Sequence, residues 1–497
     1  MTYAALEEHF RRLSRLEHLE ALGQWDEAAM MPEGGGAARS AALATLRGVI
    51  HAEATSPRVG ELLAKAESDA GRLEPWQRAN LREIKRVFSR DTALPAALVE
   101  AASLANSKSQ QAWQRLRPEN DWRSFRPLLA DVLQLQREVA FALAERFGLS
   151  RYDALLDGHE PGARSDDIAL LFAELGAFLP DLIERARERQ ASQPCTLPSG
   201  SFPIEAQREL GMSLMRRLGF DFQHGRLDTS HHPFCGGVAE DVRITTRYKE
   251  QDGLASLMAV LHETGHAKYE QHRPRAFLDQ PVGRARSMAV HESQSLMLEM
   301  QVCRSHEFAT FLSPLLGAAF PAQADTFAVE NLFRILTRVR PDFIRVEADE
   351  VTYPCHVVLR FEIERDLIEG RLEVDDIPER WDAGMQRLLG ISTAGNYRNG
   401  CMQDVHWPSG VFGYFPTYTL GALTAAQLFE AARQARPGLG AAIAQGDLSL
   451  LDSWLNENIW SRGSLLETGE LVEAATGAPL GTAAFERHLR RRYLGEG

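Results

Sequence analysis

The sequence predicts a large, mainly α-helical fold that carries one small β element. Apolar residues recur at helical spacing along most of the 497 residues. Strand-like alternation is concentrated between Phe220 and Tyr248, where the run Val242–Thr246 favours β structure. The composition, 44% hydrophobic and 25% charged, is that of an ordinary globular chain with ample core. These observations predict helices packed around a core, with a few strands inserted near the middle of the chain.

The N-terminal part of the chain is predicted to be a succession of helices. A helical pattern covers residues 1–30, and Pro32 with the glycines at 34–36 predicts a turn after it. The segment Gln193–Pro203 holds three prolines and marks a boundary. We therefore expect one α-rich domain over residues 1–497, with a helical scaffold lobe, 1–195, and a second lobe, 196–497. Helical runs in the first lobe are Ala37–Ala52, a run around Leu62–Leu63, Trp76–Ile84, Leu98–Trp113 and Phe125–Phe147.

The second lobe is predicted to be helical on both sides of the β element. A helix is expected over Glu205–Leu218, and helices resume from Leu254 onward. The exception is a turn-rich stretch, Ile391–Gly421. Glycines at 410, 413 and 421 predict a loop there that can approach a ligand closely.

Residues 262–266 form the motif His-Glu-Thr-Gly-His inside a predicted helix. Residues four apart project from one face of a helix, so His262 and His266 can share a metal ion. Neutral imidazole suits zinc, and a catalytic zinc takes three protein ligands and keeps a fourth position for water. Glu263 is placed to take a proton from that water. The motif therefore predicts a hydrolytic zinc site.

Two residues compete as the third ligand. His272 lies ten residues after His262, but an uninterrupted helix points it away from His266, and the intervening residues favour helix. Glu292 lies thirty residues after His262, on a second predicted helix, Met288–Val302. A carboxylate from a neighbouring helix completes a site of two histidines and one glutamate. We therefore predict Glu292 as the third ligand and reject His272.

HETGH, followed at this distance by HESQSL at 291–296, resembles the carboxypeptidase Taq family, the M32 metallocarboxypeptidases. Further signatures of that family occur in order: HPF at 232–234, DVRIT at 241–245, IRVEAD at 344–349 and GCMQDVHW at 400–407. The similarity runs nearly end to end, from Trp25 to Gly477. One departure follows HESQS, where the family often has an arginine and then Trp-Glu-Asn. This chain has Leu296 and then Leu-Glu-Met at 298–300.

The resemblance implies a large helical zinc peptidase of the gluzincin type, with the small β element beside the active-site cleft. It implies release of single C-terminal residues from peptides, with broad side-chain tolerance and poor activity toward proline. One Zn²⁺ per chain is the expected cofactor, with Co²⁺ also supporting activity. The expected assembly is a homodimer.

A carboxypeptidase must hold the free α-carboxylate of its substrate, and arginine offers a bidentate fork for it. Arg243, Arg247 and Arg345 are candidates, and the family motifs favour Arg243 and Arg345 without choosing between them. Glu299 and Asp349 are predicted to orient the metal-binding histidines. The remaining candidates for substrate contact are His232, Gln403 and Asp404, together with the possible oxyanion donors His356, His406, Tyr414 and Tyr418.

The composition and the chain start exclude several other classes. The net charge of −13 argues against nucleic-acid binding, and no apolar run is long enough to span a bilayer. The five cysteines show no paired spacing and the N-terminus lacks a signal-peptide core, so a cytoplasmic protein with reduced thiols is expected. Two alternatives stay open. One is a zinc endo-oligopeptidase of related fold, and the other is an inactive peptide- or metal-binding protein, which would not need Glu263.

Overall fold

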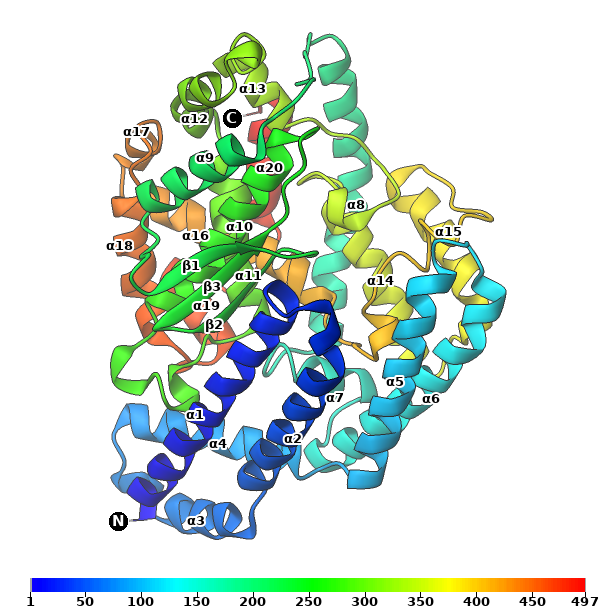
Figure 1. The fold of residues 1–497 in the computed structure, drawn as a ribbon, viewed down its shortest axis with the longest axis vertical. Coiled ribbons are helices and arrows are strands. Elements are labelled where there is room, and N and C mark those ends of the chain that lie inside the picture. Colours follow the sequence, from blue (N-terminus) through cyan, green and yellow to red (C-terminus); the bar gives the residue numbers. More distant parts are fainter. Residues whose placement is uncertain (1, 497) are drawn as a thin grey trace.

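The computed structural model describes residues 2–496 and is mainly helical, with one three-stranded sheet (Figure 1). The predicted fold class is confirmed. The helices before the sheet are α1 (Thr2–Ala29), α2 (Gly36–Ala54), α3 (Pro57–Ser68), α4 (Pro75–Asp91), α5 (Ala96–Leu116), α6 (Trp122–Phe147), α7 (Arg151–Leu156), α8 (Ser165–Ala191) and α9 (Ile204–Arg217).

The helices after the sheet carry the motifs. They are α10 (Gly253–Gln271), α11 (Met288–Leu296), α12 (His306–Ala319), α13 (Val329–Leu336), α14 (Tyr353–Ile368), α15 (Ile377–Leu389), α16 (Pro416–Ala435), α17 (Leu439–Ile443), α18 (Ser449–Asn458), α19 (Thr468–Thr476) and α20 (Ala483–Leu489). Two π-helical segments continue α11 and α20, namely η5 (Met297–Cys303) and η11 (Arg490–Leu494). None of the helices between residues 2 and 496 is long and apolar enough to cross a membrane.

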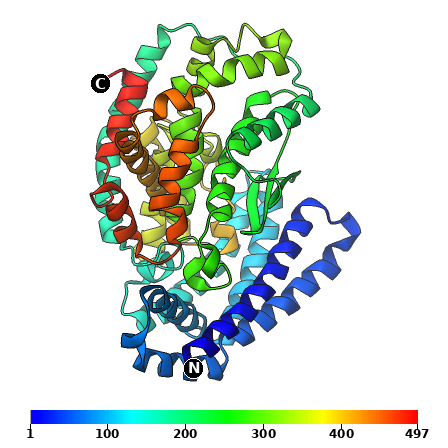
Figure 2. The same ribbon diagram turned by 90° about the vertical axis from the view of Figure 1, so that its left-hand side faces the viewer.

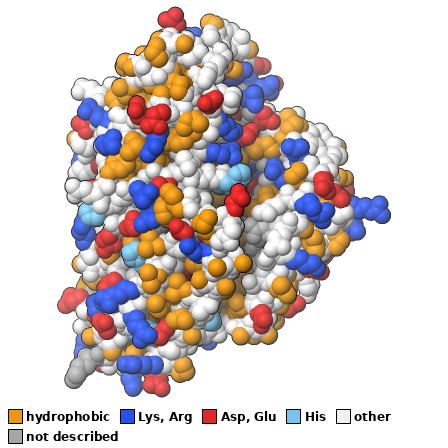
Figure 3. Space-filling model, viewed as in Figure 1, with side chains coloured by type: hydrophobic (Ala, Val, Ile, Leu, Met, Phe, Trp, Pro, Cys, Tyr) orange, Lys and Arg blue, Asp and Glu red, His pale blue; other side chains and the backbone are white. Residues whose placement is uncertain are grey.

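The first four helices form an arm with a small apolar core of its own, built from residues between Tyr3 and Ile84. Figure 2 shows the α1–α2 hairpin at one side of the molecule, where α1 contacts strand β2. The main core extends from Leu116 to Tyr493 and so runs across residue 195. The division into lobes 1–195 and 196–497 stays a prediction. In the view of Figure 3, the surface is hollowed between the α1–α2 hairpin and α5.

The sheet consists of β1 (Gly225–Thr229), β2 (Phe234–Val238) and β3 (Asp241–Thr246), in the order β1-β3-β2. Strand β1 pairs parallel to β3, and β2 pairs antiparallel to it. Val242 and Ile244 of β3 are buried against Val260 and Ala267 of α10. The sheet is therefore attached directly to the helix that carries the HETGH motif.

The predicted turn-rich stretch ends earlier than expected. Pro416 begins α16, where a proline at the start of a helix costs no hydrogen bond. Tyr418 and Gly421 therefore lie in a helix, and the prediction that Gly421 belongs to a loop is wrong. Residues 391–415 remain irregular apart from one short 3₁₀ turn, Trp407–Ser409.

Candidate metal centre

Helix α10 places His262 and His266 one turn apart. Its start is capped by Asp252, whose side chain accepts hydrogen bonds from two N–H groups of the first turn at 3.2 and 3.0 Å. The helix continues without a break to Gln271. His272 is its C-cap, with Nδ1 2.7 Å from the Lys268 carbonyl oxygen. His272, rejected above as the third metal ligand, therefore does not lie with His262 and His266.

Two glycines allow α11 to lie unusually close to its neighbours. A Cβ placed on Gly265 of α10 would lie 2.4 Å from the Gln294 carbonyl oxygen and 2.6 Å from Ser295 Cα. A Cβ on Gly421 of α16 would lie 2.9 Å from both Cβ and Cγ of Glu292. Helix α11 is thus held between α10 and α16 at distances that only glycine permits. This packing places Glu292 beside the motif histidines.

The side chains of His262, His266 and Glu292 converge. Oε2 of Glu292 lies 3.3 Å from Nε2 of His266 and 4.0 Å from Nε2 of His262. One ligand atom from each residue lies within 4.8 Å of the others. Ligand atoms bound to a tetrahedral zinc lie about 3.4 Å apart, given zinc–ligand distances of about 2.0–2.2 Å. The two nitrogens and one oxygen therefore fit Zn²⁺ with small side-chain adjustments, and they leave one position open.

The far nitrogens of both histidines are already bonded. Nδ1 of His262 lies 2.9 Å from Oε2 of Glu299, whose other oxygen accepts from Arg304 at 2.7 Å. Nδ1 of His266 lies 3.1 Å from the His291 carbonyl oxygen. Such contacts set the ring orientation and leave Nε2 for the metal. Glu299 thus occupies the position predicted for it.

Asp349, the other carboxylate predicted to orient a ligand histidine, has a different role. Its Oδ1 accepts from the N–H groups of Val351 and Thr352 at 3.0 and 3.1 Å, and its Oδ2 accepts from the Arg340 N–H at 2.9 Å. Asp349 therefore caps the turn before α14. The prediction that it orients a metal ligand is wrong, because its oxygens are occupied by backbone donors.

The helix that carries Glu292 changes geometry after Leu296. The sequence predicts one α-helix to Val302, whereas residues 297–303 are π-helical. Such segments are rare and occur frequently at functional sites. The two glutamates meet opposite sides of one imidazole, since Glu292 is near Nε2 of His262 and Glu299 binds its Nδ1.

The carboxylates around the histidines favour a positive charge. Burial raises the pKa of the Glu263 carboxyl to about 7. Burial alone would lower the pKa of His262, but Glu299, Glu292 and Glu263 together raise it to about 10. Burial lowers the pKa of His266 to about 4. A divalent cation between the three ligands would supply the positive charge that this environment favours and would leave both imidazoles neutral.

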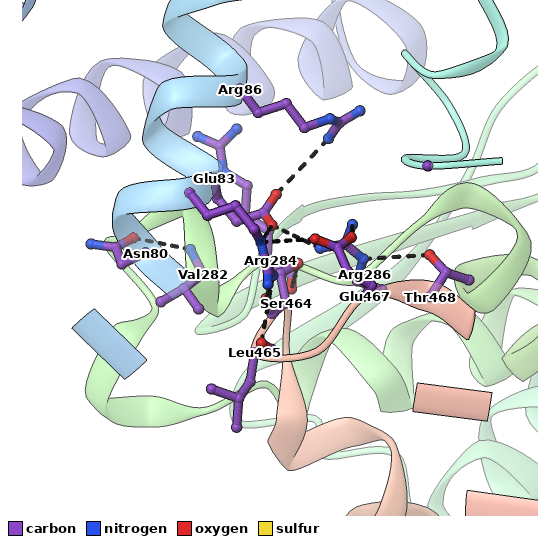
Figure 4. Close-up of polar contacts among 12 residues, drawn as sticks. Asn80, Glu83, Arg86, Val282, Arg284, Arg286, Ser464, Leu465, Glu467 and Thr468 are labelled. Atoms are coloured by element: carbon purple, nitrogen blue, oxygen red, sulfur yellow. Dashed lines mark hydrogen bonds and ion pairs between the residues drawn. The ribbon is translucent and has the colours of Figure 1, made fainter. Parts of the chain in front are cut away.

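The start of α11 is anchored by a junction of distant segments (Figure 4). The Arg286 side chain, 1% exposed, donates to Glu83 of α4 at 2.8 Å and to Glu467, just before α19, at 2.7 Å. Ser287 and Glu160 accept hydrogen bonds from N–H groups of the first turn of α11, at 3.2 and 3.0 Å. Glu292, the third predicted ligand, therefore lies one turn after a helix N-terminus whose N–H groups are hydrogen-bonded.

Arg345 lies in a buried charged cluster. Its Nε and Nη2 donate to Oδ1 of Asp404 at 3.1 and 2.9 Å, and its Nη1 donates to the Tyr353 hydroxyl at 2.8 Å. The Gln403 side chain accepts from the Arg345 N–H at 2.8 Å. Arg360 donates to the second oxygen of Asp404 at 2.7 Å. Two guanidinium groups share one carboxylate, so the cluster has an excess of positive charge.

Helix α14 has a buried polar face of which the sequence predicted only His356. His356, Arg360 and Glu364 recur every four residues, and each is fully buried. The sequence contains one indication of this polar face, namely an arginine at 360 inside the apolar run 357–361. His356 is fully buried, and burial lowers its pKa well below the usual value; its role as an oxyanion donor stays a prediction. Glu364 accepts from Trp407 at 2.8 Å and from Tyr152 at 2.9 Å.

The arginines of the β element have other surroundings. Arg243 pairs with Asp241 through Nε at 3.0 Å and Nη2 at 2.7 Å. Its guanidinium carbon lies 4.2 Å from the ring centre of Trp25 in α1. Arg243 therefore links the sheet to the arm. Arg247 and His232 are exposed at one end of the sheet, after β3 and between β1 and β2.

His406, Tyr414 and Tyr418 form one aromatic group at the start of α16. Nε2 of His406 lies 3.2 Å from the Tyr418 hydroxyl, and the rings of Tyr414 and Tyr418 are 5.3 Å apart. The Tyr414 hydroxyl lies 3.9 Å from the sulfur of Met288, the first residue of α11. Burial raises the pKa of Tyr418 to about 12 and lowers that of His406 to about 4. The tyrosine hydroxyl is therefore a hydrogen-bond donor at neutral pH.

Comparison with known proteins identifies the family of the chain. Residues 5–493 match the family model of carboxypeptidase Taq (M32) metallopeptidase. Thermostable carboxypeptidase 1 of Thermus thermophilus is 38% identical over 501 residues, covering 99% of this chain and 98% of the relative. The structure of Trypanosoma cruzi metallocarboxypeptidase 1 superposes with a TM-score of 0.97 at 43% identity, over 99% of each chain. The M32 carboxypeptidase of Deinococcus radiodurans gives a TM-score of 0.94 at 36% identity, over 99% of this chain and 98% of the other. The chain therefore belongs to the carboxypeptidase Taq (M32) family and is a metallocarboxypeptidase.

Proposed function

We propose that this metallocarboxypeptidase uses one Zn²⁺, held by His262, His266 and Glu292, to release single C-terminal amino acids from peptides. The observation that carries the proposal is the convergence of these three side chains beside Glu263. We further propose broad side-chain tolerance, poor activity toward proline, activity with Co²⁺, a homodimeric assembly and a cytoplasmic location. These properties are implied by the resemblance to the family.

Bound Zn²⁺ would act as a Lewis acid that polarises the scissile carbonyl and lowers the pKa of a water molecule. The Glu263 carboxylate, next to His262 on α10, takes a proton from the attacking water. It then delivers that proton to the amine nitrogen of the leaving residue, so the carboxylate is regenerated. Burial raises the pKa of Glu263, which favours acceptance of a proton by its carboxylate.

Tyr414 is the best-placed donor to the developing oxyanion. It is partly exposed, and its hydroxyl lies 3.9 Å from the Met288 thioether, which is a weak acceptor. Burial raises the pKa of Tyr414 above its usual value, so the hydroxyl keeps its proton. Tyr418 is instead bonded to His406, and this pair supports the ring of Tyr414.

Arg345 is the proposed anchor for the substrate α-carboxylate. The cluster that it forms with Arg360 around Asp404 has more positive than negative charge, which favours an incoming anion. Arg243 is less suited, because Asp241 balances its charge one for one and its guanidinium face lies against Trp25. An endo-oligopeptidase would not need such an anchor.

The test uses the zinc-loaded enzyme and an N-acylated Ala-Arg dipeptide, with a C-terminally amidated peptide as the matched substrate. Wild type should release free arginine from the dipeptide and leave the amide intact. Glu263→Gln should bind zinc but lose about 10²–10⁴-fold in turnover. Arg345→Met should raise KM much more than Arg243→Met. Cleavage of the amide at the rate of the free acid would refute the exopeptidase proposal and favour the endo-oligopeptidase.

A further inference from the structure

The C-terminal segment of the chain reaches the helix that carries the metal site. Arg492, in η11, donates from Nη1 to the Met300 carbonyl oxygen and from Nη2 to the Gln301 carbonyl oxygen, the latter at 2.9 Å. Both carbonyls belong to η5, which ends at Cys303, so they lie among those without a partner inside the helix. Arg492 therefore caps this helix, and its charge faces the negative end of the helix dipole.

Arg492 is itself held in place by a buried carboxylate. Glu350, which is 1% exposed, accepts from Arg492 at 2.9 Å, from the Tyr493 hydroxyl at 2.7 Å and pairs with His488 Nε2 at 2.6 Å. Burial alone would raise the pKa of Glu350, but Arg492 and His488 lower it well below its usual value. The guanidinium group thus has two carbonyls on one side and an ionised carboxylate on the other.

The capped backbone carries the glutamate that orients a predicted metal ligand. Glu299 directly precedes Met300, and its carboxylate lies 2.9 Å from Nδ1 of His262. Its second oxygen accepts from Arg304, which also donates to a carbonyl of α13 at 2.9 Å. A rotation of the backbone at residues 299–301 would move the Glu299 carboxylate away from the imidazole. Contacts of this kind are known to control metal affinity.

We propose that Arg492 is a positioning residue of the metal centre. By holding the carbonyls of Met300 and Gln301, it keeps Glu299 against His262 and so strengthens binding of the divalent cation. The C-terminal segment, about 230 residues away from His262 in sequence, is then part of the support of the site. The inference rests on the metal ligands proposed above.

The test measures the affinity of the full-length apoenzyme for Zn²⁺ by competition with a chromogenic chelator, and the visible spectrum after Co²⁺ loading. Arg492→Met should bind Zn²⁺ about 10-fold more weakly, and Glu299→Gln about 10- to 100-fold more weakly. The double variant should bind no more weakly than Glu299→Gln alone, because Arg492 acts through Glu299. Arg491→Met is the matched control, since Arg491 is exposed on the same segment and should leave affinity unchanged.

If Arg492→Met does not fold as the apoprotein, Arg492→Lys replaces it, because lysine keeps the charge but lacks the fork that reaches both carbonyls. Wild-type zinc affinity in the folded variant would overturn the proposal, and so would additive losses in the double variant. Failure of the proposed function looks different. In that case wild type binds no zinc, or His262→Ala binds it as well as wild type does.

Discussion

Replacing Gly265 by alanine should weaken the metal site without touching any ligand. The added Cβ would lie 2.4 Å from the Gln294 carbonyl oxygen and 2.6 Å from Ser295 Cα. Ordinary non-bonded contact begins at 3.4 Å, so α10 and α11 must separate by about 1 Å at their crossing. The atoms that clash are backbone atoms, and a close-packed crossing cannot relieve them by a change of rotamer.

This displacement is large compared with the tolerance of a zinc site. Glu292 Oε2 and His266 Nε2 are 3.3 Å apart, close to the roughly 3.4 Å that a tetrahedral zinc requires. A further separation of about 1 Å forces the side chains out of their supported orientations. We expect zinc affinity to fall about 10-fold or more, and the apoenzyme to lose about 1–3 kcal/mol of stability through overpacking.

The assay is zinc competition on the purified apoenzyme, combined with thermal unfolding of the same samples. The matched control is Gly48→Ala in α2, where an added Cβ meets nothing within 4 Å. That variant should keep wild-type zinc affinity and gain about 0.5–1 kcal/mol in stability, as an exposed helical glycine replaced by alanine does. Unchanged zinc affinity in Gly265→Ala would refute the argument that the close crossing sets the ligand geometry.

Three further outcomes follow from the same structure. Gly421→Ala should also weaken zinc binding, because its Cβ would lie 2.9 Å from Cβ and Cγ of Glu292, the proposed third ligand, and 3.2 Å from the Ala289 carbonyl oxygen; unchanged affinity would contradict this. Chelation should remove about 2.7 kcal/mol of folding stability if zinc was present at 100 times Kd, so Tm should fall by an amount that grows with the starting zinc concentration, and the Tm of His262→Ala should not change. Burial raises the pKa of Glu364 to about 7, above the unfolded value of about 4.3, so folding favours its protonated form and stability falls as pH rises from about 4.3 to 7. The Tm of Glu364→Gln should therefore fall less between pH 5 and pH 8 than the Tm of wild type. Identical dependence of Tm on pH in the two proteins would argue against the raised pKa.

Much of the fold and part of the site were predictable because they depend on short-range patterns. Apolar spacing predicted several helices to within a few residues, among them α2, α5, α6 and α9, and the four-residue spacing of His262 and His266 predicted their shared face. Glu292 was identified from a second helix at a suitable distance and from the family motifs. The turn-rich stretch was extended too far because glycine was interpreted only as a loop residue, whereas Gly421 lies in a helix that packs on Glu292.

Other features depend on segments that meet only in three dimensions. His356 was predicted as an oxyanion donor and Asp349 as a residue that orients a ligand histidine, but His356 is fully buried within α14 and Asp349 caps a turn. The sequence does not show that Asp241 and Trp25 lie beside Arg243, or that Arg360 lies beside Arg345; these neighbours support the proposal of Arg345 as the carboxylate anchor.

The sequence by itself determined the helical class, the motif helix and the chemical types of the ligands, since these follow from residues three or four positions apart. The tertiary structure alone decided how close α11 comes to α10, which nitrogen of His262 faces Glu299, and that Arg492 reaches the π-helical segment. The physical reason is that hydrogen bonds and metal coordination require atoms to be placed within fractions of an ångström of their ideal distances. Such distances are set by the packing of helices that are far apart along the chain.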